Sequence, residues 1–140
     1  MQTPSTSFNV GAKVHWPFAI LTVLVVQALM VVAAFAWVAI YAYGIHPGEA
    51  AAYYEAYAQV ASPISALITG PALYYLAARW LRRRLGESAV STALVAAGIA
   101  VALDIAVTVT SASIPLQWWL CLVNAPLKAA ALWFGVRARA

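Results

Sequence analysis

An uninterrupted apolar run near the start of the chain, Pro17–Tyr43, constrains the fold more than any other feature. At a rise of 1.5 Å per residue, a helix of about 27 residues reaches roughly 40 Å, which exceeds the ~30 Å hydrocarbon thickness of a bilayer. A cleaved secretory signal is the competing interpretation, because Lys13 precedes the run and Ala34-Phe35-Ala36 imitates a cleavage site. The run continues past that site, so we expect a membrane-spanning helix.

The overall composition supports a membrane protein. Hydrophobic residues make up 65% of the 140 residues and charged residues 9%, against about 45–50% and about 25% in soluble domains. A net charge of +4 would suggest nucleic acid as the partner of a soluble chain. Here the basic residues flank apolar runs, where anionic lipid headgroups are the nearer partner. We therefore expect one all-α integral membrane domain that contacts the lipid bilayer and no nucleic acid.

Further apolar runs predict a four-transmembrane-helix bundle with short loops. A flexible cytoplasmic tail over residues 1–14 is expected to precede a transmembrane domain over residues 15–140. Within this domain, the predicted spans cover residues 17–43, 60–81, 89–111 and 116–136. Residues 49–59 carry tyrosines and acids spaced four apart, which indicates an interface-level start for the second helix.

Two prolines lie inside the second predicted span. Pro63 and Pro71 each remove a backbone hydrogen bond and crowd the preceding turn, so the helix is expected to bend. In lipid such a break survives only where other groups hydrogen-bond the freed carbonyls. The hydroxyls of Ser62, Ser65 and Thr69 are in place for that role.

The basic residues predict the orientation of the bundle. Arginines gather at the ends of the second and fourth spans, Lys13 precedes the first span, and the two other loops contain no Lys or Arg. Because positive charge favours the cytoplasmic side, we expect both termini to be cytoplasmic. The short loops and the absence of sorting signals are typical of a bacterial inner-membrane protein. Binding of anionic lipid is the alternative role for these arginines. They are Arg79, Arg82, Arg83, Arg84, Arg137 and Arg139.

Asp104 is the residue that most needs an explanation, because it lies inside the third predicted span. A carboxylate there costs about 2.5–3.5 kcal/mol on insertion scales, so it must face protein or water. Asn124 of the fourth span lies at a depth similar to that of Asp104, and Lys128 lies one turn deeper in the same span. Lys128 is expected either to reach Asp104 or to extend its stem to the cytoplasmic headgroups. The group is thus a binding or proton-relay site, or a structural clip; Gln27 is expected to form an interhelical hydrogen bond.

Small residues recur every fourth position in the third span, at Gly98, Ala102 and Ala106, and again at Ala93 and Ala97. Such spacing lets helix backbones approach closely in membranes. We therefore hypothesise a non-enzymatic accessory or assembly protein that packs against other membrane helices through this face. The alternative is a small-solute or proton-coupled transporter that uses Asp104 as its ionisable site, as an oligomer.

Sequence motifs give little support to enzymatic chemistry. The chain lacks HExxH, GxSxG, a Gly-rich phosphate loop and paired histidines for a haem, so we expect no catalytic residue and no cofactor. Its single cysteine, Cys121, is interpreted as a packing residue. His46, Glu49 and Glu55 offer metal-binding atoms, but one nitrogen ligand is too few to predict a metal site.

Overall fold

The computed structural model describes residues 13–110 and 115–138, leaving aside the side chains of residues 115–118. The described residues are almost entirely helical and include no β-strand, which confirms the all-α prediction. Most of the predicted tail, the turn before Pro115 and Arg139 lie outside these residues. The helical elements are α1 (Trp16–Ile40), the π-helical turn η1 (Tyr41–Ile45), α2 (Ala51–Leu85), the 3-10 turn η2 (Gly86–Ser88), α3 (Ala89–Thr110) and α4 (Pro115–Arg137).

The start of α1 is tied to α3. Pro17 occupies the first turn of α1, where its missing N–H removes no helical hydrogen bond. Just before it, the His15 backbone N–H donates to Thr92 Oγ1 over 3.2 Å. The Thr92 hydroxyl in turn donates to the Ser88 carbonyl at 2.8 Å. Thr92 is fully buried, so this short chain of hydrogen bonds fixes α1 against the start of α3.

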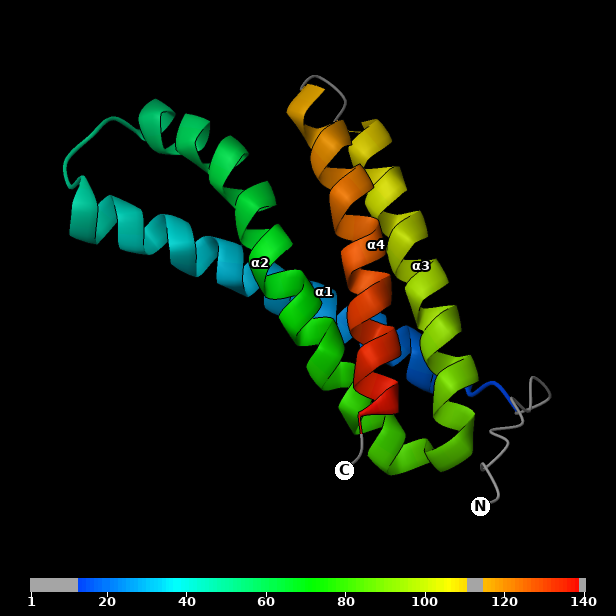
Figure 1. Ribbon diagram of the computed structural model, residues 1–140. Helices are drawn as coiled ribbons and strands as arrows, with labels where there is room; N and C mark the ends of the chain where they lie inside the picture. The colour runs from blue at the N-terminus through cyan, green and yellow to red at the C-terminus, as the bar shows by residue number, and fades with distance from the viewer. Residues whose placement is uncertain (1–12, 111–114, 139–140) are drawn as a thin grey trace, which may run out of the picture.

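Helix α2 runs through both of its prolines without interruption and curves along its length (Figure 1). Its 35 residues correspond to about 52 Å: it begins within the interface-level start expected over residues 49–59 and ends one turn after the predicted second span. The expected role of Thr69 needs correction: its hydroxyl donates to the Ser65 carbonyl at 2.8 Å, and not to the Leu67 carbonyl that Pro71 leaves free. That choice follows from helix geometry, because a threonine hydroxyl reaches the carbonyl four residues back.

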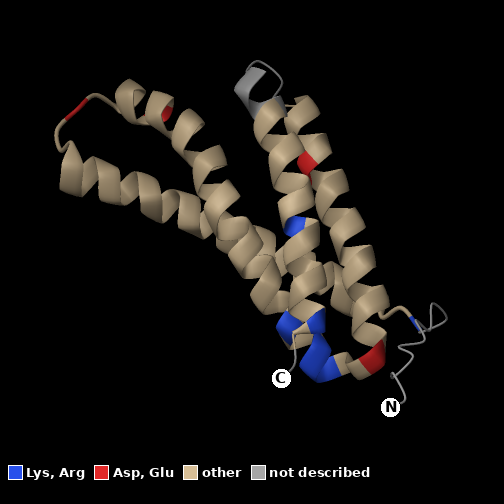
Figure 2. Cartoon of the chain, viewed as in Figure 1, with Lys and Arg blue, Asp and Glu red and all other residues tan. Residues whose placement is uncertain are grey.

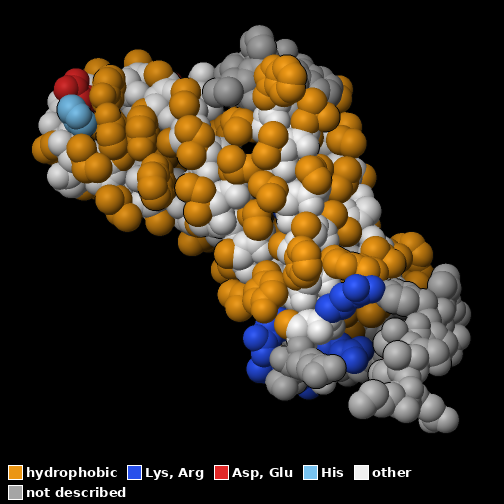
Figure 3. Space-filling view, in the orientation of Figure 1, with side chains coloured by type: hydrophobic (Ala, Val, Ile, Leu, Met, Phe, Trp, Pro, Cys, Tyr) orange, Lys and Arg blue, Asp and Glu red, His pale blue; other side chains and the backbone are white. Residues whose placement is uncertain are grey.

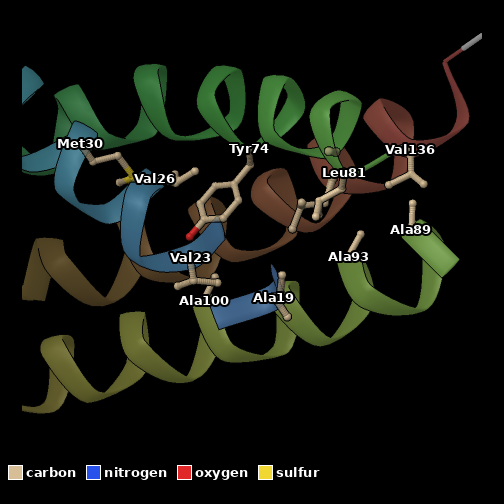
Figure 4. Close-up of a cluster of buried hydrophobic side chains, with 13 residues drawn as sticks. Ala19, Val23, Val26, Met30, Tyr74, Leu81, Ala89, Ala93, Ala100 and Val136 are labelled. Carbon is tan, nitrogen blue, oxygen red and sulfur yellow. The ribbon is translucent and has the colours of Figure 1, made fainter. Parts of the chain in front are cut away.

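The hydrophobic core lies where all four helices meet, near the end of the bundle that carries the arginines. Tyr74 is its largest buried apolar side chain, and its ring reaches from α2 toward Val23 of α1 (Figure 4). The fully buried hydrophobic residues that α3 contributes to this core are all alanines, which lets α1 and α2 approach it closely. The α3 alanines are Ala89, Ala93, Ala96 and Ala100.

Away from this core, the α1–α2 pair diverges from the α3–α4 pair (Figure 1). The end of α1 and the start of α2 form an arm of their own, held together by aromatic side chains. Trp37 Nε1 donates to the Tyr57 hydroxyl at 3.0 Å. The Tyr41 ring stacks on Tyr57 with 3.7 Å between ring centroids. These contacts join the end of α1 and η1 to α2, and none of them reaches α3 or α4.

The charged residues divide the molecule into a basic end and an open end. The basic end holds the α2–α3 turn and both described chain ends, and Figure 2 shows its cluster of blue residues. The open end holds the aromatic arm and the other ends of α3 and α4. Between these ends the surface is mostly apolar, as the orange side chains of Figure 3 show. Such a distribution suits lipid contact rather than water contact.

Three helical stretches of the described chain are long and apolar enough to cross a membrane: Trp16–Ile45, Ala51–Thr110 and Trp119–Arg137. The middle stretch has 60 residues because α2, η2 and α3 follow one another directly along the chain. The chain reverses direction there at Gly86, whose φ of +56° favours glycine. The Arg82 guanidinium donates to the Gly86 carbonyl at 2.8 Å and stabilises this reversal.

Candidate functional site

Asp104 and Lys128 form an ion pair between α3 and α4. The Lys128 Nζ lies 2.7 Å from Asp104 Oδ2 and 2.9 Å from Oδ1, so it donates to both carboxylate oxygens. The Lys128 side chain is 1% exposed and that of Asp104 is 15% exposed. Of the two sequence-based alternatives for Lys128, the structure therefore shows the one in which it reaches Asp104. Charge-assisted bonds of this kind offset part of the free energy needed to bury both groups.

The stem of Lys128 passes over a glycine of α2. A Cβ atom added at Gly70 would stand 3.2 Å from Lys128 Cε and 3.6 Å from Met30 Cε. The Lys128 nitrogen also lies 5.7 Å from the centroid of the Tyr74 ring, within range of a cation–π contact. Gly70 and Tyr74 were not singled out for this site from the sequence.

Asn124 lines the same region but does not join the ion pair. Its Oδ1 is buried and has no hydrogen-bond partner among the described residues. Among the described residues, Asn124 makes no hydrogen bond to Asp104, whose two carboxylate oxygens instead accept from Lys128. A buried amide oxygen without a partner costs about 1–3 kcal/mol.

A cleft of about 790 Å³ opens above the ion pair, between the aromatic arm and the α3–α4 pair. All four helices contribute to its walls, which are mainly apolar. The cleft follows from the divergence of the two helix pairs, which sequence periodicity does not predict. Its polar lining residues are Gln27, Gln59, Ser62, Asp104, Thr108 and Asn124.

Gln27 faces this cleft from α1. It is half-buried, and the expected interhelical hydrogen bond is not among the contacts of the described residues. The four residues predicted to form the intramembrane polar site, Gln27, Asp104, Asn124 and Lys128, thus meet at one place. Three of them line the cleft, and Lys128 lies directly beneath it, bonded to Asp104.

The small-residue face of α3 points away from the bundle. Gly98, Ala102 and Ala106 are all exposed, and a Cβ added at Gly98 would meet nothing within 4 Å. The buried alanines of α3 lie on the other side; Ala100, two residues after Gly98, is rotated from it by about 200°. Within the chain, α3 therefore packs through Ala96 and Ala100 and leaves the Gly98 face uncovered.

The arginines predicted for topology or anionic lipid gather at the basic end (Figure 2). Arg82, Arg83 and Arg84 occupy the last turn of α2, where positive charge is favourable to the helix dipole. Arg137 lies over the Trp133 ring at 4.0 Å from its centroid. Arg79, one turn before Arg83, is half-buried. Arg139 lies outside the described residues.

The described residues contain no group of three His, Cys, Asp or Glu side chains placed to hold a metal ion. His46 and Glu49 instead belong to the turn after α1. The Tyr54 hydroxyl accepts from the Glu49 N–H at 3.0 Å and donates to the His46 carbonyl at 2.6 Å.

Comparisons with known proteins give no relative for this arrangement. No protein-family model, curated protein or solved structure matches the chain.

Proposed function

We propose that this protein is a non-enzymatic accessory or assembly protein of the bacterial inner membrane. It crosses the bilayer four times with both termini in the cytoplasm. It packs against other membrane helices, or against another copy of itself, through the Gly98–Ala102–Ala106 face of α3.

The observation that carries this proposal is the exposure of that face. Three small residues, each four positions after the last, lie on the side of α3 opposite the core. In lipid, apolar surface alone gives no drive for helices to associate, so close backbone approach through small residues supplies the contact. Within the chain, contacts with the other helices bury only the Ala100 side of α3. The Gly98 face has the same four-residue spacing of small residues and is left exposed.

The state of the ion pair gives further support. Lys128 satisfies both oxygens of Asp104, and its own side chain is buried. A carboxylate paired in this way joins α3 to α4 rather than standing ready to bind an ion or proton. That is the behaviour expected of a structural clip in an accessory protein.

The proposal is tested by photo-crosslinking from Ala106 in native membranes. A photoreactive amino acid at this position is expected to give one discrete protein adduct. Ala102→Leu should abolish the adduct by filling the space that a partner backbone needs, whereas Ala72→Leu should leave it unchanged. Ala72 is also an exposed alanine, on α2, and provides the matched control. Adducts to lipid alone, or equal adducts from both variants, would overturn the proposal.

The cleft favours a second candidate, a small-solute or proton-coupled transporter. Asp104 lines a large opening at membrane depth, as an ionisable transport site would. In that case Ser62→Cys, in a Cys121→Ser background, should react from outside intact cells with a membrane-impermeant thiol reagent. A lack of labelling, with a labelled His46→Cys control, would remove the outward water path that transport needs.

A further inference from the structure

The cleft between the two helix pairs is closed at its inner end. Beneath Asn124, the side chains of Met30 and Lys128 meet over Gly70, where even a methyl group would stand 3.2 Å from the lysine stem. The fully buried core lies below this contact. The residues that line the cleft include none of the buried residues below Met30, so the cleft suits a molecule shorter than a membrane-spanning helix. A shorter molecule that enters from the lipid or from the open end does fit.

The floor of the cleft carries no net charge. The carboxylate of Asp104 is neutralised by Lys128 at 2.7 Å. A cation would have to compete with Lys128 for Asp104, and an anion would have to draw out a lysine that is 1% exposed. Either exchange leaves a charge unpaired in a region of low dielectric constant, which is strongly unfavourable. The site therefore selects against both kinds of ion.

Two amides next to this neutral pair remain available. Gln27 lines the cleft from α1 and Asn124 from α4, and Asn124 Oδ1 has no partner among the described residues. The oxygen is covered by protein, but the terminal torsion of asparagine has a broad range, so the amide turns toward a ligand at little cost. Its pairing with a donor would recover a hydrogen bond that the bundle alone leaves unmade.

The remaining walls supply an apolar surface. Leu24, Val31, Leu103 and Val107 line the cleft from α1 and α3. The volume of about 790 Å³ lies within the range of about 300–1,000 Å³ that is common for small-molecule pockets. Such pockets combine apolar walls with a few polar groups that orient the ligand.

We propose that this cleft binds an uncharged amphiphile: an apolar chain lies against the walls, and a hydroxyl or amide head bonds Asn124 and Gln27. The bilayer itself, as a source of neutral lipid, and a soluble amphiphile that partitions into the membrane both supply this chemistry. The site lies on the opposite side of α3 from the Gly98 face, so the proposal is independent of the assembly function.

The test uses three photoreactive probes on the full-length protein reconstituted in vesicles. They are diazirine-bearing hexadecanol, hexadecyl phosphate and hexadecyltrimethylammonium, which share a chain and differ in head charge. Hexadecanol is expected to label peptides from at least two cleft helices, and to do so about tenfold more than either ion.

Two variants test the location. Asn124→Leu removes the amide at nearly constant size and should lower hexadecanol labelling by roughly tenfold, in line with the loss of one buried hydrogen bond. Ala58→Trp fills the mouth of the cleft from the arm, away from the core, and should abolish labelling. Thr110→Leu removes an exposed polar group that does not line the cleft and is expected to label as wild type.

Equal labelling by all three probes, or labelling unaffected by Asn124→Leu and Ala58→Trp, would mean only general lipid contact and would overturn the proposal. Preferential labelling by the cationic probe would also overturn it, because Asp104 would then be available to a cation. Organic extraction of the purified protein separates the two sources. A neutral lipid retained by wild type and lost in Ala58→Trp identifies the bilayer as source, and labelling without a retained lipid identifies a soluble amphiphile.

Discussion

Gly135 of α4 lies against the backbone of α2 at Tyr75, so closely that a Cβ atom at residue 135 would stand 2.6 Å from the Tyr75 carbonyl oxygen. The same atom would stand 2.7 Å from the Cβ of Ala78. Neither obstacle is the flexible end of a side chain, so the two helices must separate to admit even one methyl group. This contact sets the spacing between α2 and α4 at the basic end.

Gly135→Ala is therefore expected to destabilise the protein by about 1–3 kcal/mol, the usual range for an overfilled core. The measurement is equilibrium unfolding by SDS titration in mixed micelles. Gly98→Ala is the matched control: it has nothing within 4 Å of the added Cβ and should be neutral or stabilising by up to about 1 kcal/mol. Equal effects of the two substitutions would show that α2 and α4 do not meet at Gly135.

The ion pair predicts unequal effects for its two single substitutions. Asp104→Asn leaves an unpaired lysine that is 1% exposed, whereas Lys128→Met leaves a carboxylate that is 15% exposed and lines the cleft. We expect the first to lower the free energy of unfolding by about 3–5 kcal/mol and the second by less. The double variant should recover most of the loss, because no charge remains buried. An Asp104→Asn variant as stable as wild type would instead favour the transport candidate.

Thr92 predicts a smaller and more local effect. Thr92→Val keeps the shape of the side chain but removes the acceptor of the partly buried His15 N–H, so it should cost about 1 kcal/mol. Thr110→Val is the control, because the Thr110 hydroxyl bonds only carbonyls of its own helix and is exposed. The same unfolding measurement checks both. If Thr92→Val and Thr110→Val had the same stability, the hydrogen bond from His15 to Thr92 would not hold the start of α1 against α3.

The proposed orientation predicts which turns face the outside of the cell. In a Cys121→Ser background, His46→Cys should react with a membrane-impermeant thiol reagent in intact cells. Glu87→Cys lies in η2 beside the arginines and should react only after the membrane is opened. Both positions are exposed in the folded chain, so access to the reagent alone decides the result. The reverse pattern would invert the topology, and labelling of both in intact cells would contradict a four-span arrangement.

The helical class of the chain was predictable from its sequence, and a contact with Asp104 was one of the two alternatives for Lys128. Long apolar runs specify helices in lipid because every backbone group must be hydrogen-bonded within the segment. Depth along a helix follows from its constant rise, which placed Lys128 within reach of Asp104 before any fold was known. Neither inference needs knowledge of which helices are neighbours.

The cleft and the close contacts were beyond such reasoning. Lipid chains and leucine side chains are equally apolar, so hydropathy does not tell which face of α1 or α2 meets protein. Gly70 and Gly135 look alike in sequence, yet one accommodates a lysine stem and the other a backbone carbonyl. Those roles depend on the spacing between helices, which is set by many contacts together. The partner of Thr69 was likewise not predicted correctly, because its hydroxyl donates to the Ser65 carbonyl of its own helix.

The pairing of Asp104 with Lys128 also bears on how the chain is made. Lys128 follows Asp104 by 24 residues, so if the chain is inserted into a membrane as proposed, the acid is synthesised before its partner. Alone in hydrocarbon, each charge opposes the insertion of its own helix by about 2.5–3.5 kcal/mol. Together they neutralise one another. We therefore expect α3 to be retained at the insertion machinery until α4 has been synthesised, and the two helices to be inserted into the lipid together as one hairpin.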